Sequence, residues 1–558
     1  MKPLDWVVLC AWLVILISYG LWRGRGSNSV NEFLLAGKTM PWYAMGLSIM
    51  ATQAGAITFI STPGQAYVDG MRFVEFYLGL PIAMVILSAT VVPIFHRAKV
   101  YTAYEYLEGR FDSKTRGLVA AIFLIERGLG AGVALVAPSI VLSVMFGWPF
   151  TLTTLIMGAV LILFTTLGGI KAITWADVPQ MLMILGALIL ALFIAVSRLP
   201  ADVSFLDAVR VAGAAGKLNA IDTHFSWNDR YNLWSGLIGG AFLALAYFGT
   251  DQSQVQRYLT GKSIGQSRLS LLFNALAKVP VQFFILFIGA IVFVFFVFER
   301  PPLLFQPNEL QRVAATAQYP EIEARYNRAF EDRQTAARRI KDAADAPARS
   351  AAIEQFHTAQ GAFDGARGDA MKLGKESDTN YIFLTFVTQH LPIGIVGLVM
   401  AVIFTAAMSS ISGEINSLAT VTVIDVYKRH FRPDGTDHHF LNASRVATVF
   451  WGFYAVAFAN FAHGLGALIE AVNLVGSLFY GGMLGVFVLA FFVKRVGGTA
   501  AFYGVIAGEA AIFWSAKFTS IAFLWYNVIG CVVVIGVALA ISVIEPRRIV
   551  KNESRTRP

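Results

Sequence analysis

The sequence predicts an all-α polytopic membrane protein with about thirteen transmembrane helices, and two observations carry this prediction. Hydrophobic residues make up 56% of the 558 residues, while charged residues make up only 14%. Apolar runs of roughly 20 residues, the length that a helix needs to cross a bilayer, recur from one end of the chain to the other. A soluble fold would not need so many of them.

The predicted spans follow one another along the chain. The apolar run at the N-terminus is too long for a signal-peptide core and lacks a small-x-small cleavage site, so it predicts a retained span. Residues 379–426 are too many for one simple crossing and predict a short re-entrant or amphipathic piece before the main helix, or a helix that projects into the cytoplasm. In order, the spans are 5–22, 41–66, 74–95, 117–146, 150–168, 178–198, 234–256, 269–299, 379–426, 443–462, 467–493, 498–517 and 520–544.

The net charge of +9 resides largely in loops between spans. Basic residues cluster at 97–99, 110–116, 257–268 and 428–432, whereas the short loops 147–149 and 463–466 carry none. By the positive-inside rule, this places the N-terminus outside and the C-terminus in the cytoplasm, in a plasma (inner) membrane. Basic residues do not interleave with exposed aromatics in one compact patch, which argues against a nucleic-acid partner. We expect the lipid bilayer and a small solute as partners, with the oligomeric state left open.

The sequence supports neither a disulfide or metal site at its cysteines nor an enzyme active site. Cys10 and Cys531 both lie in apolar runs and are interpreted as small core residues, not as a disulfide or a metal pair. The spans hold no His/Glu metal cluster, no Ser/His/Asp set and no phosphate-cradling loop. We therefore expect no enzyme activity.

Residues 306–378 form a charged, Ala-rich segment with helical spacing, interrupted near Pro347. Because long loops translocate largely regardless of charge, the segment is compatible with a place outside the membrane. It predicts either a solvated helical hairpin or a cap that regulates the protein or binds a partner.

Two spans contain polar residues that an ordinary span would avoid. Residues 48–64, SIMATQAGAITFISTPG, place small polar residues and Gly55 in mid-span, which predicts a helix break whose free carbonyls coordinate a cation. Close packing by small residues is the alternative. Residues 401–417, AVIFTAAMSSISGEINS, hold Ser409, Ser410 and Ser412, whose hydroxyls are hard donors suited to sodium or serve interhelical hydrogen bonds.

Five blocks of sequence together resemble the sodium/solute symporter family, whose carriers move sugars, proline, carboxylates or sialic acids. The resemblance implies two five-helix inverted repeats with broken first and sixth core helices. It divides the chain into an extra N-terminal span and loop (1–40), a first repeat (41–200), a second repeat (201–305 and 379–495), two further spans (496–545) and a basic tail (546–558). The blocks are 48–64, TAYEYLEGRF (102–111), TTLGGIKAITWADVPQ (165–180), YFGTDQSQVQRYLTGKS (247–263) and AMSSISGEINSLATVTVIDVYKR (407–429).

The resemblance also implies a sodium site. Its ligands would be the backbone oxygens of Ala51, Ala54 and Ala406 and the hydroxyls of Ser409 and Ser410. A second sodium site or an ion exit would use Thr58, Asp177 and Ser412. The glycines at positions 55 and 413 lack the hydroxyls of two-sodium carriers, and a helix-capping role is an alternative for Asp177.

The implied substrate pocket is drawn from several spans. Tyr247 falls at the family's inner aromatic gate and Asn473 at a polar contact of sugar carriers, but positions 53, 77 and 244 differ from those carriers. Arg127 lies inside a span beside Glu126 and would bind a substrate carboxylate, or else it lies at the membrane interface. Lys278 is a second candidate for a buried cationic residue. The candidate wall, with ordinary packing as the alternative, is Gln53, Thr58, Phe73, Tyr77, Arg127, Tyr247 and Asn473.

These observations predict a sodium-coupled symporter that imports a small polar organic solute by alternating access. The solute class expected is a carboxylate, a sialic-acid-like molecule, a polyol or a sugar. A membrane sensor built on the transporter fold and a proton-coupled carrier are the alternatives.

Overall fold

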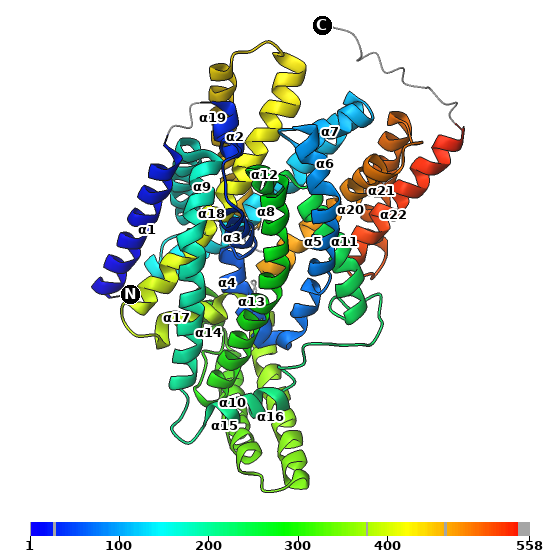
Figure 1. Ribbon diagram of the computed structural model, residues 1–558. Helices are drawn as coiled ribbons and strands as arrows, with labels where there is room; N and C mark the ends of the chain where they lie inside the picture. Colours follow the sequence, from blue (N-terminus) through cyan, green and yellow to red (C-terminus); the bar gives the residue numbers. More distant parts are fainter. Residues whose placement is uncertain (1, 26–28, 375–377, 463–465, 545–558) are drawn as a thin grey trace.

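A computed structural model describes residues 2–25, 29–374, 378–462 and 466–544, and its regular elements are helices (Figure 1). Within these residues, nine helical stretches are long and apolar enough to cross a membrane. The all-α membrane class is thereby confirmed. The nine stretches do not correspond one to one with the thirteen predicted spans, because broken helices fall into short pieces and adjoining helices merge. The predicted basic tail, 546–558, lies outside the described residues.

The first part of the chain runs through long helices interrupted at a few defined points. α9 is long enough for two crossings and contains Gly169 in a non-helical conformation with φ 59°, which separates the two spans predicted there. The elements are α1 (Pro3–Gly24), α2 (Val30–Leu35), η1 (Ala36–Lys38), α3 (Trp42–Gln53), α4 (Ala56–Asp69), η2 (Gly70–Tyr77), α5 (Leu80–Ala89), α6 (Val91–Ala98), α7 (Ala103–Arg110), α8 (Ser113–Phe146), α9 (Phe150–Ser197) and α10 (Phe205–Ala214).

The second part begins with another broken helix and ends with two long hydrophobic helices. As predicted, a short helix, α17, precedes the main helix of the 379–426 stretch. The elements are η3 (Ser235–Gly239), α11 (Gly240–Gly249), α12 (Gln252–Leu259), α13 (Ile264–Phe298), α14 (Pro307–Ala314), α15 (Tyr319–Asp342), α16 (Ala346–Leu373), η4 (Thr379–Tyr381), α17 (Ile382–His390), α18 (Ile395–Val421), η5 (Thr422–Phe431), α19 (Asp437–Ala462), α20 (Leu468–Phe492), α21 (Gly498–Phe518) and α22 (Leu524–Ile544).

α18 forms the centre of the bundle and is buried along almost its whole length. It packs against α1, α8, α9, α3 and α4, so both pieces of the first broken helix touch it. At its N-terminus, the Asp5 carboxylate of α1 accepts hydrogen bonds from the Gly394 and Gly397 backbone N–H groups, at 2.6 and 3.2 Å. A carboxylate at this position satisfies donors that the helix leaves unpaired. The central helix is therefore fixed against its neighbours.

The predicted insertion is a pair of long helices, α15 and α16, that projects from the end of the bundle opposite to α2 and α7 (Figure 1). The pair has its own small core, built around Tyr326, Phe330 and Phe363. The side chain of Arg333 attaches it to the bundle by donating to the Phe296 carbonyl at the end of α13, at 2.5 Å. The predicted interruption lies at residues 343–345, and Pro347 stands in the first turn of α16, where proline is well tolerated.

Candidate functional site

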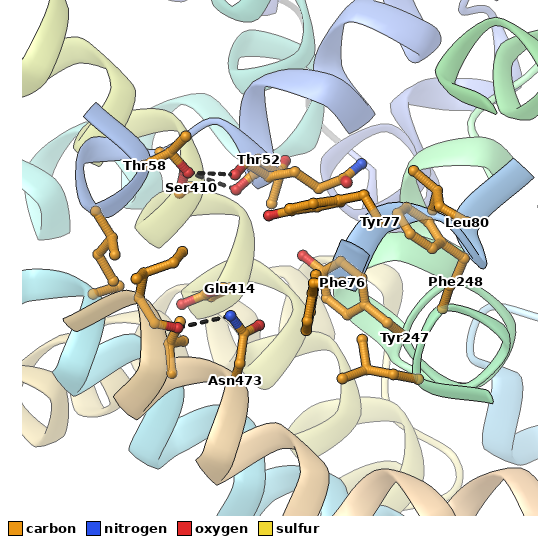
Figure 2. A pocket seen from close by; sticks show the side chains of 18 of the residues that line it. Thr52, Thr58, Phe76, Tyr77, Leu80, Tyr247, Phe248, Ser410, Glu414 and Asn473 are labelled. Atoms are coloured by element: carbon orange, nitrogen blue, oxygen red, sulfur yellow. Dashed lines mark hydrogen bonds between the residues drawn. The ribbon is translucent and has the colours of Figure 1, made fainter. Parts of the chain in front are cut away.

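The predicted break in the first core helix is present. α3 ends at Gln53, and α4 begins at Ala56 after Gly55, whose backbone is extended (φ −72°, ψ −179°). Side-chain hydroxyls hydrogen-bond to carbonyls at the end of α3: Thr58 Oγ1 donates to the Gln53 oxygen at 2.8 Å, and Ser410 Oγ donates to the Thr52 oxygen at 3.1 Å (Figure 2). The break therefore presents carbonyl oxygens to the neighbouring helix α18.

Glycine is required at position 55 because α18 approaches closely there. A Cβ atom added to Gly55 would lie 2.5 Å from Ser410 Oγ, too close for any real contact. The Ser410 hydroxyl also lies 3.0 Å from the Ala406 carbonyl oxygen and 3.5 Å from that of Ala51. Thus the structure brings together one hydroxyl and the carbonyls of Ala51, Thr52 and Ala406, while Ala54 lies within the break itself. Neutral oxygen ligands from an unwound helix suit an alkali cation.

The Ser409 hydroxyl points elsewhere: it donates to Asp177 Oδ1 of α9. The other carboxylate oxygen of Asp177 accepts hydrogen bonds from Ser48 Oγ and from Arg257, whose Nη1 lies 2.9 Å away. Asp177 and Arg257 are completely buried. Because Asp177 lies in the interior of α9, the interpretation of this carboxylate as a helix cap is wrong.

The sequence analysis misplaced Arg257, since its charge suggested a cytoplasmic loop. It belongs to α12 and is 1% exposed. A Cβ atom on Gly413 would collide with its guanidinium, so the glycine makes room for the arginine. Burial of an arginine requires a charged partner, which Asp177 supplies. The proposed second sodium position thus already has a guanidinium beside it.

The second predicted break, in the sixth core helix, separates α11 from α12 at Thr250 and Asp251. Asp251 caps α12 by accepting from the Ser253 backbone N–H at 2.8 Å. Its other carboxylate oxygen accepts hydrogen bonds from Arg127 and from the Tyr480 hydroxyl, the latter at 3.0 Å. The break therefore presents a carboxylate to the interior of the bundle.

Arg127 lies within α8 and not at an interface, since only 3% of its side chain is exposed. Besides Asp251, its guanidinium contacts Glu414 Oε1 at 3.1 Å and Glu126 Oε1 at 3.3 Å. Side chains from α8, α18 and the α11–α12 break thus meet in one buried cluster of three carboxylates and one guanidinium.

A cavity of about 130 Å³ lies between the two breaks and α18. In Figure 2, Glu414 and Asn473 stand on one side of it and the aromatic rings of Phe76, Tyr77 and Tyr247 on the other. Of the predicted wall, the structure places six residues at the cavity: Gln53, Thr58, Tyr77, Arg127, Tyr247 and Asn473. The sequence analysis missed Phe76, Phe248, Glu414 and Tyr480, which also line it.

Phe73 does not line this cavity and is a correction to the predicted wall. Its ring stacks on that of Phe76, with centroids 5.5 Å apart and an interplanar angle of 12°, and Phe76 faces the cavity instead. Lys278 of α13 is buried and places its ammonium 5.1 Å from the centroid of the Tyr77 ring. Lys278 is not among the residues that line the cavity, whereas Tyr77 is.

Comparisons with known proteins agree with this geometry. The sequence model of the Sodium:solute symporter family matches residues 33–321 and 356–508, leaving out part of the helical insertion. The sodium/glucose cotransporter of Vibrio parahaemolyticus is 27% identical, over 90% of this chain and 83% of its own length. The sodium/sialic acid symporter NanT of Aliivibrio fischeri is also 27% identical, over 95% and 91%.

Among solved structures, the substrate-bound outward-open state of a Na⁺-coupled sialic acid symporter aligns over 98% of both chains with a TM-score of 0.76 at 23% identity, which shows a shared fold. Two relatives of equal identity carry the names of different solutes, so similarity alone does not choose the solute. The family match covers most of the chain, and the chain therefore belongs to the sodium:solute symporter family: it is a sodium-coupled membrane transporter and not an enzyme.

Proposed function

We propose that the protein imports a small polar solute together with one sodium ion, which is held between the α3–α4 break and α18. The observation that carries this proposal is the Ser410 hydroxyl, which lies among the carbonyl oxygens of Ala51, Thr52 and Ala406. The ligands we assign are the carbonyls of Ala51, Ala54 and Ala406 and the Ser410 hydroxyl. The Ser409 hydroxyl, bonded here to Asp177, is the fifth ligand that the resemblance implies.

The position of the ion links it to the solute. The α3–α4 break supplies Gln53 and Thr58 to the cavity wall, and α18 supplies Ser410 and Glu414. A cation between these two elements holds them in the arrangement that completes the cavity. Coupling then follows because sodium and solute both bind one arrangement more tightly than the other, which is the condition for shifting a conformational equilibrium.

One sodium ion is favoured over two by the surroundings of Asp177. Its carboxylate already has a cationic partner in Arg257 and hydroxyl donors in Ser48 and Ser409. A second sodium ion there would lie against the guanidinium, and like charges repel strongly in a buried site. We propose that Asp177 and Arg257 instead line the exit of the single ion.

The cavity limits the size of the solute. Its volume of about 130 Å³ is room for about ten water molecules at roughly 13 Å³ each. A solute of about that number of non-hydrogen atoms fits without rearrangement of the wall, which favours a molecule no larger than a monosaccharide. The basic residues at the α6–α7 end, opposite to the helical insertion, support import toward a cytoplasm on that side of the inner membrane.

Uptake into proteoliposomes tests the proposal. Purified protein is reconstituted and given an inward sodium gradient, with potassium as the control cation, and accumulation of radiolabelled small polar solutes is measured. We expect saturable accumulation that a sodium ionophore abolishes, with a Hill coefficient for sodium near 1. Flux that ignores the sodium gradient, or that follows a proton gradient alone, would contradict the proposal.

A further inference from the structure

The buried cluster around Arg127 holds more negative than positive groups. Its single guanidinium contacts three carboxylates, those of Glu126, Asp251 and Glu414, and the acidic side chains are at most 7% exposed. Buried carboxylates are costly unless a cation or a hydrogen bond compensates them. Arg127 compensates one negative charge, and Asp251 also accepts hydrogen bonds from the Ser253 backbone N–H and the Tyr480 hydroxyl. One carboxylate is left for another cation.

Neighbouring basic side chains do not supply that cation. The Arg257 guanidinium is paired with Asp177 at 2.9 Å. Lys278 does not line the cavity, and its ammonium lies 5.1 Å from the centroid of the Tyr77 ring. A further compensating cation can therefore reach the cluster only as a ligand in the cavity.

Glu414 is the carboxylate that faces the cavity. Its Oε1 atom contacts Arg127, whereas its Oε2 atom is buried and has no hydrogen-bond partner among the described residues. The side chain is 6% exposed and lines the cavity one helical turn after Ser410 on α18. Figure 2 shows it beside Asn473, facing the aromatic rings. Glu414 therefore has one buried acceptor without a partner in a side chain that lines the cavity, and a donor on the ligand would satisfy it.

Aromatic rings provide the rest of the surface. Phe76, Tyr77, Tyr247 and Phe248 line the cavity, and Arg127 already occupies a position 5.5 Å from the Tyr247 centroid. Ring faces attract cations, and desolvation strengthens that attraction. In contrast, a solute carboxylate would meet the unpaired oxygen of Glu414 and a guanidinium whose partners are carboxylates of the chain. The cavity therefore disfavours an anion.

We propose that the solute carries a positively charged ammonium group, which lies between the Glu414 carboxylate and the aromatic rings. The inference rests on the proposed function, since it assigns the substrate class of the same cavity. It covers both cationic and zwitterionic solutes of about ten non-hydrogen atoms, and Asn473 Oδ1 is available to a second polar group.

Matched pairs of probe molecules distinguish the effect of the ammonium charge on binding from the effect of molecular shape. Choline and its uncharged isostere 3,3-dimethylbutan-1-ol form one pair, and 4-aminobutyrate and pentanoate form another. These are measured within a wider panel of primary amines, zwitterions, alcohols, sugars and carboxylates of similar size. Thermal unfolding of the purified full-length protein is followed in sodium and in potassium, in phosphate buffer free of amines. We expect sodium-dependent stabilisation by ammonium members and at least tenfold weaker binding of their isosteres.

The variant Glu414→Gln keeps the shape and removes the charge. We expect about 10- to 100-fold weaker binding of the best ammonium probe, the range expected when a charge-assisted hydrogen bond is lost. Glu509→Gln is the matched control, since both carboxylate oxygens of Glu509 on α21 are buried and the residue does not line the cavity. Sodium-dependent stabilisation without solute, measured in the wild type and in Glu509→Gln, reports separately on the proposed function.

Three results would overturn the proposal. One is that no ammonium member of the panel stabilises the protein. Another is that neutral or anionic solutes stabilise it as well as their ammonium partners do. The third is that Glu414→Gln keeps full affinity for the ammonium probe and loses only the pH dependence of binding, which would assign the carboxylate to a proton instead.

Discussion

Replacing Ser410 with alanine removes the one hydroxyl that lies among the carbonyls of the α3–α4 break. A hydrogen bond to a charged group contributes about 1.5–3 kcal/mol, and we take this range for the hydroxyl bound to sodium. Without sodium, the same hydroxyl donates to a neutral carbonyl, at 3.0 Å from Ala406 or 3.1 Å from Thr52, and contributes about 1 kcal/mol. The difference of about 0.5–2 kcal/mol corresponds to a rise of about 2- to 30-fold in the half-saturating sodium concentration.

The assay is binding of ²²Na⁺ to the purified protein, supported by the sodium dependence of thermal unfolding. Ser139→Ala is the matched control, because Ser139 is a buried serine of α8 whose hydroxyl donates to the carbonyl of Leu135 at 2.8 Å. We expect the control to retain wild-type sodium affinity. Equal sodium affinity in Ser410→Ala and Ser139→Ala would refute the assignment of the ion to this break.

Further predictions concern Gly55 and Gly413, which α18 and Arg257 approach closely, and Arg127 in the buried carboxylate cluster. Gly55→Ala places a methyl group against the Ser410 hydroxyl. We expect sodium-dependent uptake to fall at least tenfold in this variant. Uptake at the wild-type rate would contradict the close approach of the two helices. Gly413→Ala displaces the Arg257 guanidinium, and we expect this overpacking to cost about 1–3 kcal/mol of stability in a thermal unfolding measurement. Gly186→Ala is the control, because the space around Gly186 is open, and we expect it to leave the stability unchanged. Arg127→Gln leaves three buried carboxylates without a cation and costs about 3–5 kcal/mol; an unchanged unfolding temperature in detergent would show that the cluster is not charged.

Local composition was sufficient to predict the helix break on which the proposed sodium site is built. The break at Gly55 follows from small and polar residues in the middle of an apolar run, and the serines of α18 stand out within their span for the same reason. Both features belong to short windows of sequence. The structure confirms the break and places Ser410 against it.

The charged pairs could not be predicted in this way because their partners are far apart along the chain. Asp177 and Arg257 are 80 residues apart, and Arg127 and Glu414 are 287 residues apart. No local periodicity encodes such pairing, so Arg257 was counted with the loop charges and Glu414 was passed over. Only the packing of α18 against α8 and α9, and of α12 against α18, brings these partners together.

The error at Phe73 has a geometric cause. Residues 70–77 form a 3₁₀ helix, η2, in which side chains three residues apart lie above one another. Phe73 and Phe76 therefore stack, and only the latter reaches the cavity.

A cryo-EM structure determined in saturating sodium chloride, compared with one in potassium chloride, tests the central claim most directly. The account predicts density for one ion, in sodium only, within coordination distance of the Ala51 and Ala406 carbonyls and the Ser410 hydroxyl, with α3 and α4 still separated at Gly55. An uninterrupted helix through Gly55, or an ion bound at Asp177 in place of this position, would contradict it.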